Sequence, residues 1–159
     1  MLVRTYAPVG QTPILKVPLT RDHLSVMGAI TPEGKIIMQS QDHSYKGPDV
    51  VRFLQVLTRE IPGKLLVIWD GAAIHRCQAV KDYLAQGGAK RLHLERLPAY
   101  APELNPQEGV WNLLKRFELH NVCCLSVQHV QRELRRAKER LRHRKSVLRQ
   151  CFAHAGCQL

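Results

Sequence analysis

The sequence predicts one mixed α/β domain, in which a sheet is flanked by helices. A hairpin pattern near the start is followed by an amphipathic helix, an uninterrupted apolar strand, a second helix and a further short strand. The chain has 159 residues, of which 45% are hydrophobic and 23% charged. This length and composition suffice to bury one core without disulfides, so we expect residues 1–159 to form a single domain.

The N-terminal part is expected to be an irregular arm followed by a hairpin. Prolines and a glycine interrupt the first twenty residues, which favours an arm or a short edge strand. Residues 23–30 and 35–39 are rich in apolar and β-branched side chains. Between them, Pro32 and Gly34 occupy positions favoured in a type I turn. The sequence therefore predicts a β-hairpin here.

The next segment predicts a helix that leads into a central strand. Gly47 and Pro48 open it, and apolar residues then recur at helical spacing, at Val50, Leu54, Leu57 and Ile61. Residues 65–69 are all apolar, which is typical of a strand covered on both faces. Asp70 would then lie at the carboxyl end of that strand, where ligands bind in open α/β sheets.

A second strand and a capped helix are expected to follow. A helix from about Arg76 to Gln86 leads to a strand over residues 92–97. The loop from Pro98 to Pro106 contains three prolines and should be stiff. Asn105 is a suitable N-cap for the next helix, which places Glu108 in its first turn. The apolar face of this helix is expected to consist of Val110, Trp111, Leu114 and Phe117.

Residues 126–153 are expected to form a basic, helical C-terminal part. Apolar side chains recur at steps of three and four, at Val127, Val130, Leu134, Ala137 and Leu141, and Ser146 is expected to cap a short last helix. Between Gln131 and Arg149 there are nine Lys or Arg and two Glu, within a chain of net charge +11. Such a stretch attracts phosphate backbones, although it can equally be a solvated helix face. Arg135 and Arg142 are candidate DNA contacts.

Asp70 and Glu108 each have a structural explanation in the local sequence. An aspartate that precedes glycine is a common turn residue, because its carboxylate binds nearby main-chain N–H groups. Glu108 stands three residues after Asn105, where a capping-box glutamate would reach back to the cap. Taken singly, neither carboxylate identifies a functional site.

Two longer blocks place these acids in a shared context. Residues 67–75 (VIWDGAAIH) and 97–111 (LPAYAPELNPQEGVW) resemble, in the same order, two signature blocks of DDE-type transposases of the mariner-like bacterial insertion-sequence group. The resemblance extends through essentially the whole chain. In that family the first block carries the second catalytic aspartate and the second block carries the catalytic glutamate, which correspond here to Asp70 and Glu108.

The resemblance implies a ribonuclease-H-like fold, a mixed sheet flanked by helices, and a catalytic domain for metal-dependent DNA strand cleavage and transfer. Asp70 and Glu108 would bind Mg²⁺ or Mn²⁺ in a two-ion site, where ions about 3.5 to 4 Å apart activate the attacking oxygen and stabilise the leaving one. The implied partners are the DNA of transposon ends and targets and a second copy of the chain. We expect a cytoplasmic, nucleoid-associated bacterial protein without a membrane span.

The family uses a third carboxylate, on an opening strand that would precede the arm. Neither Asp22 nor Asp42 lies in an apolar strand of the required type. We therefore expect the opening strand to be missing, and a fragment that is inactive or depends on a separate polypeptide for its N-terminal part. The alternatives are a non-catalytic, basic DNA-binding remnant or partner subunit, and a free-standing nuclease of the same fold.

Further DNA contacts are expected near the two acids. His75 could contact the scissile phosphate or a metal-bound water, or be a structural histidine. Arg76 follows the strand that carries Asp70, and Lys115 and Arg116 lie on the helix of Glu108, so all three are candidate phosphate ligands. Trp111 is expected in the core rather than stacked on a base.

Overall fold

The structure, a computed structural model, describes residues 7–11, 23–120, 122, 124 and 126–157. Its strands are β1 (Ser25–Ile30), β2 (Ile36–Gln41), β3 (Leu65–Trp69) and β4 (Leu92–Arg96). Its α-helices are α1 (Gly47–Glu60), α2 (Gln78–Ala85), α3 (Pro106–Leu113), α4 (Val127–Arg142) and α5 (Lys145–His154). Short 3₁₀ turns cover Ala73–Arg76, Gly88–Lys90 and Pro102–Leu104, and a π-helical turn, Leu114–Glu118, extends α3.

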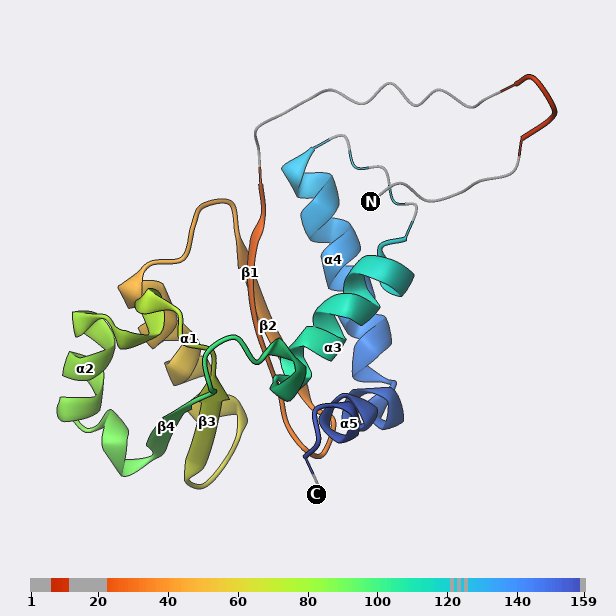
Figure 1. Cartoon of the computed structure of the whole chain (residues 1–159). Helices are drawn as coiled ribbons and strands as arrows, with labels where there is room; N and C mark the ends of the chain where they lie inside the picture. The colour runs from red at the N-terminus through yellow and green to blue at the C-terminus, as the bar shows by residue number, and fades with distance from the viewer. Residues whose placement is uncertain (1–6, 12–22, 121, 123, 125, 158–159) are drawn as a thin grey trace.

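The predicted hairpin is confirmed, and it occupies the centre of the molecule (Figure 1). β1 and β2 are antiparallel, with Ser25 opposite Gln41 and Ile30 opposite Ile36. Gly34 has a φ of +81°, which favours glycine, and its N–H donates to the carbonyl oxygen of Thr31 at 2.8 Å. The tight turn therefore fixes the register of the two strands.

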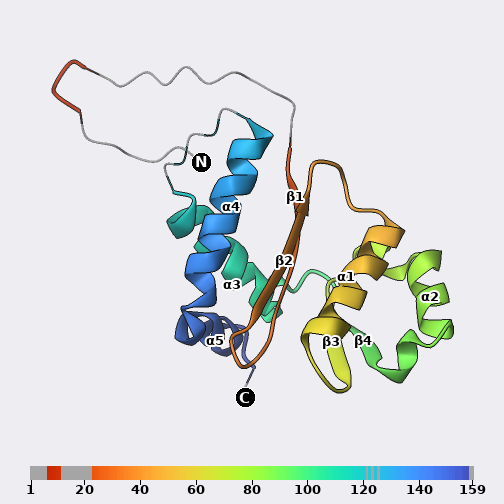
Figure 2. The same ribbon diagram turned by 180° about the vertical axis from the view of Figure 1, so that it is seen from behind.

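Side chains of the hairpin alternate between two hydrophobic cores. Ile36 and Met38 pack in a cluster with residues of α3, α4 and α5, whereas Ile37 packs in a second cluster with α1. The first core is closed by Val110, Leu134, Ala137, Leu141 and Leu148, all buried. Figure 1 and the reverse view in Figure 2 show α1 on one side of the hairpin and α3, α4 and α5 on the other.

The second sheet differs from the prediction in its burial. β3 and β4 are parallel, with Trp69 opposite Arg96, and Leu65, Val67 and Trp69 pack toward the α1 cluster. The expectation that β3 is covered on both faces is wrong, since Leu66 and Ile68 are 60% and 54% exposed. Among the described residues, α1 and α2 supply cover for one face only.

The described strands form two separate two-stranded sheets instead of one continuous sheet. α1 joins them, because the cluster around Val50, Phe53 and Leu54 contains residues from both sheets. No strand within the described ranges pairs with the outer edge of β1 or of β3.

Two helix details also differ from the prediction. Phe117 is 68% exposed, not part of the apolar face, because the wider π-helical turn that begins at Leu114 changes the direction of the residues after it. The last helix begins at Lys145, so Ser146 lies inside its first turn and does not cap it. Elsewhere the predicted caps are confirmed: Ser126 accepts a hydrogen bond from the His129 N–H at 3.1 Å.

The predicted N-terminal arm lies largely outside the described residues. Within it, residues 7–11 form a turn in which the Gln11 N–H donates to the Pro8 carbonyl oxygen at 3.0 Å. In the part of the chain that the structure describes, no helix is long and apolar enough to cross a bilayer.

Candidate active site

Asp70 lies immediately after the carboxyl end of β3, as the sequence predicts. Its Oδ1 accepts a hydrogen bond from the Ala72 N–H at 3.0 Å, so the turn-forming role of this aspartate is real. Oδ2 takes no part in this bond. The side chain is 62% exposed, and one carboxylate oxygen is therefore available to a ligand.

His75 is placed against Asp70 by the 3₁₀ turn Ala73–Arg76. Its Nδ1 lies 3.0 Å from Oδ1 and 3.3 Å from the main-chain oxygen of Asp70. The ring stacks on Trp69, with centroids 4.4 Å apart and planes at 5°, and the side chain is only 15% exposed. Because both neighbouring oxygens are acceptors, Nδ1 carries the proton, and the imidazole orients the aspartate.

A hollow of about 630 Å³ brings Asp70, His75 and Arg76 together with two cations that the sequence analysis missed, Lys81 and Arg96. Arg96 passes close to Gly71, where a Cβ atom would lie 2.9 Å from its Nε. The sequence did contain a signal for Arg96: it ends the strand parallel to β3, and parallel strands end at the same edge of a sheet.

Glu108 lies in the first turn of α3, as predicted, but the capping box is not formed. The cap is Asn105, whose Oδ1 accepts from the Gln107 N–H at 3.1 Å. The Glu108 carboxylate is exposed and has no hydrogen-bond or ion-pair partner among the described residues. Its local structural role is thus absent, and both oxygens can accept ligands.

Gln107, beside Glu108, is the opposite case. Its side-chain nitrogen and oxygen are buried and have no hydrogen-bond partner in the described ranges. The amide lies against β1, since a Cβ at Gly28 would be 2.9 Å from Nε2. Buried amides are normally satisfied, so this position is a vacancy for a hydrogen-bonding group.

The other predicted contacts lie apart from the hollow. Glu108, Lys115, Arg116, Arg135 and Arg142 do not line it, and the four cations are exposed on the π-helical turn and on α4. Trp111 is partly buried against the core, as expected.

A buried acid fixes the helix of Glu108 to α4. The Glu118 side chain is 8% exposed and accepts from Arg140 Nε at 2.6 Å and from Arg144 Nη1 at 3.0 Å. These two arginines of the basic C-terminal part are therefore engaged in the fold, whereas Arg135 is not.

The oxygens left free on Asp70 and Glu108 are hard donors, the ligand type that Mg²⁺ prefers. No group of three or more His, Cys, Asp or Glu side chains that could hold an ion occurs among the residues that the structure describes. Asp70 and Glu108 thus fit a divalent metal as a partial ligand set.

Comparison with known families decides the relationship of the chain. The family described as "DDE superfamily endonuclease" matches residues 2–131, most of the sequence. The chain belongs to the DDE superfamily of endonucleases. A comparison with curated protein sequences gives no match.

Solved structures similar to this DDE superfamily domain include those of the Mos1 mariner transposase. The Mos1 paired-end complex with Mn aligns with a TM-score of 0.63 at 18% identity, covering 96% of this chain and 50% of that chain. The Mos1 catalytic domain aligns with a TM-score of 0.52 at 16% identity, covering 87% and 82%. The domain thus spans about half the length of the Mos1 chain in that complex, and the predicted ribonuclease-H-like α/β fold is confirmed.

Proposed function

We propose that residues 1–159 form a single transposase catalytic domain that cleaves and transfers DNA strands, with Asp70 and Glu108 as metal ligands. One observation carries the proposal. In a DDE superfamily chain, these two acids follow β3 and begin α3, and both keep carboxylate oxygens that the fold does not use. A bound Mg²⁺ or Mn²⁺ pair would activate the attacking oxygen and stabilise the leaving oxygen of the phosphodiester.

The remaining residues would hold the DNA and orient the acids. Arg76 lies in the hollow beside Asp70, and Lys115 and Arg116 follow Glu108 on exposed positions, so each can contact a phosphate. Arg135 and Arg142 on α4 would add affinity that does not depend on sequence. His75 could reach a phosphate or a metal-bound water only at its exposed edge, because Trp69 covers its ring.

The proposed partners are transposon-end DNA, target DNA and a second copy of the chain. One solved Mos1 transposase structure is a paired-end complex with the left transposon end, and another is a strand transfer complex. We infer the same partner classes here, and with them a nucleoid-associated location.

We also infer that a strand from a separate polypeptide completes the sheet and supplies the third carboxylate. Three features support this partner: the unpaired outer edges of β1 and β3, the exposed Leu66 and Ile68, and the unsatisfied amide of Gln107. Without that strand, two carboxylates would neutralise a metal pair poorly, and the domain would be inactive.

The test is a nicking assay on supercoiled DNA with Mg²⁺ or Mn²⁺, using the chain alone and with a polypeptide that carries an Asp-bearing apolar strand. Nicking that needs the added strand and is abolished by Asp70→Asn and by Glu108→Gln is the expected result. Nicking by the chain alone would reject the dependence on a partner and favour a free-standing nuclease.

A second candidate function is DNA binding without catalysis, which is favoured by the incomplete metal-ligand set in the described part of the chain. In that case neither metal nor added strand would give nicking, and wild type, Asp70→Asn and Glu108→Gln would bind DNA equally. This outcome would refute the catalytic proposal for the chain.

A further inference from the structure

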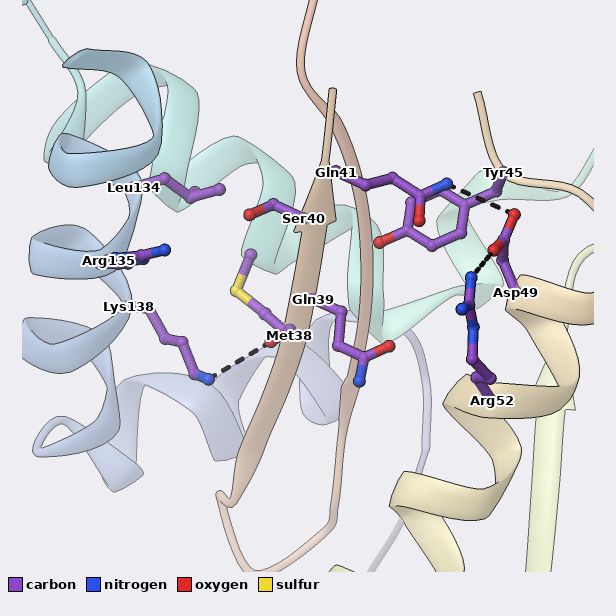
Figure 3. A pocket seen from close by; sticks show the side chains of 10 residues that line it. All are labelled: Met38, Gln39, Ser40, Gln41, Tyr45, Asp49, Arg52, Leu134, Arg135 and Lys138. Carbon is purple, nitrogen blue, oxygen red and sulfur yellow. Dashed lines mark hydrogen bonds and ion pairs between the residues drawn. The ribbon is translucent and has the colours of Figure 1, made fainter. Parts of the chain in front are cut away.

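A cleft of about 530 Å³ lies at the outer edge of β2, between the start of α1 and α4 (Figure 3). β2 runs along it: Figure 3 shows Met38 and Ser40 on the side of α4, and Gln39 and Gln41 on the side of α1. Arg52 borders the cleft from α1, and Arg135 and Lys138 border it from α4. None of the residues proposed as metal ligands lines this cleft.

The acid in the cleft is already satisfied by the fold. Asp49 Oδ2 accepts from the Lys46 N–H at 2.7 Å and from Gln41 Nε2 at 3.4 Å, and Oδ1 pairs with Arg52. The Lys46 N–H, more than Arg52, holds the pKa of Asp49 below its usual value, so the carboxylate is charged and compensated. The Asp49–Arg52 pair therefore contributes no net charge to the cleft.

Two cations remain without a countercharge. Arg135 is exposed and makes no hydrogen bond or ion pair with any described residue. Lys138 donates only to the main-chain oxygen of Met38, at 3.3 Å, a bond that leaves its charge uncompensated. By contrast, Arg136, the next residue on the same helix, pairs with Glu133 at 2.8 Å. Net positive charge is thus concentrated on the face of α4 that borders the cleft.

The positive face continues beyond the cleft along α4. Arg135, Lys138 and Arg142 are spaced by three and four residues, so they lie on one side of the helix. A row of this kind suits a long anion with regularly spaced charges better than a single small ion.

The free edge of β2 is poorly suited to an added peptide strand. The Met38 carbonyl faces Lys138, so by the alternation of an antiparallel ladder the main-chain groups of Met38 and Ser40 point away from β1. Lys138 occupies one of these acceptors, and a lysine at this place is a common protection against strand pairing. The Met38 and Ser40 N–H groups and the Ser40 hydroxyl remain as donors.

We propose that this cleft binds the phosphate backbone of a DNA segment, at a surface separate from Asp70 and Glu108. Arg135 and Lys138 provide the charge, and Ser40 provides the hydroxyl and N–H donors for phosphate oxygens. Such a contact positions DNA without reading its sequence. The identity of the anion as DNA rests on the proposed function, but binding at the cleft requires neither metal nor catalysis.

The test measures binding of a labelled DNA duplex by fluorescence anisotropy in EDTA, over a range of salt concentrations. The double variant Arg135→Gln/Lys138→Gln is compared with Arg136→Gln, which removes the same kind of charge from the same helix outside the cleft. For wild type, we expect the slope of log affinity against log salt to exceed that of the double variant by about 2, that is about one per phosphate contact. Arg136→Gln should retain the wild-type slope.

A double variant that binds like Arg136→Gln would overturn the proposal. Inorganic pyrophosphate and a glutamate-rich peptide of matched charge serve as further probes. Loss of pyrophosphate binding with unchanged DNA binding would reassign the cleft to small anions, and selective loss of peptide binding would reassign it to an acidic protein. Because the assay contains no metal, absence of nicking elsewhere leaves these outcomes interpretable, and thermal unfolding of each variant verifies its fold.

Discussion

Nδ1 of His75 lies 3.0 Å from Oδ1 of Asp70, while the imidazole ring stacks on Trp69. The histidine therefore makes two separable contributions, a hydrogen-bond donor toward the aspartate and a flat surface against the indole. The first would orient the carboxylate, and the second would stabilise the turn after β3.

Two substitutions separate these contributions. His75→Phe keeps the ring but loses the donor, so we expect weaker Mn²⁺ binding, by about ten-fold, with little change in Tm. His75→Asn keeps a donor but loses the ring, so it should retain more of the Mn²⁺ affinity and lower Tm. Isothermal titration and thermal unfolding measure the two effects, with Asp70→Asn as the control for binding at this site. Unchanged Mn²⁺ affinity in His75→Phe would exclude a positioning role.

Asp49 should make stability depend on pH in the acid range. Its folded-state pKa is held down, first by the Lys46 N–H. The stabilisation is therefore complete above the pKa of an unfolded aspartate, about 3.9, and is lost as pH falls through the lower folded value. Asp49→Asn should lower Tm at pH 7, and the difference from wild type should shrink toward zero below about pH 3. A difference in Tm that is constant across this range would contradict the prediction.

Two glycines with the same φ of +81° form a matched pair. At Gly63 a Cβ would meet no atom within 4 Å, whereas at Gly34 it would lie 2.8 Å from the Lys145 carbonyl oxygen. Gly63→Ala should lower the free energy of unfolding by about 1 kcal/mol, the cost of the left-handed backbone. Gly34→Ala should cost about 1 to 3 kcal/mol more because the hairpin turn must move away from α5. Urea unfolding of both variants measures this, and equal losses would show that the turn contact is unimportant.

The uncovered face of β3 should promote self-association. Leu66 and Ile68 are exposed apolar side chains on a strand with an unpaired edge among the described residues. Leu66→Gln/Ile68→Thr should reduce concentration-dependent association in light scattering and leave Tm nearly unchanged. Val67→Thr, between them on the covered face, should instead lower Tm because it buries a hydroxyl. If the double variant lowers Tm as strongly as Val67→Thr, the face is covered in solution.

The elements near the candidate site were largely predictable from local patterns. The turn at Thr31–Gly34, the helix after Gly47 and the cap at Asn105 depend on residues close together in the chain, and all three are confirmed. The positions of Asp70 at a strand end and of Glu108 in a first turn were predictable for the same reason. Phe117 was not, because the change from α- to π-helical geometry at Leu114 leaves no mark in the apolar spacing.

The sequence by itself determined the order of the elements, the local place of both acids and, through residues 67–75 and 97–111, the resemblance to DDE transposases. Only the tertiary structure decided which local roles these acids fulfil: Asp70 uses one oxygen in its turn, and Glu108 uses none in a cap. It also brought Arg96 to Asp70 and turned Arg135 and Lys138 toward one cleft. The physical reason is that hydrogen-bond partners, burial and net charge depend on residues far apart in the chain, which periodicity and capping rules do not register.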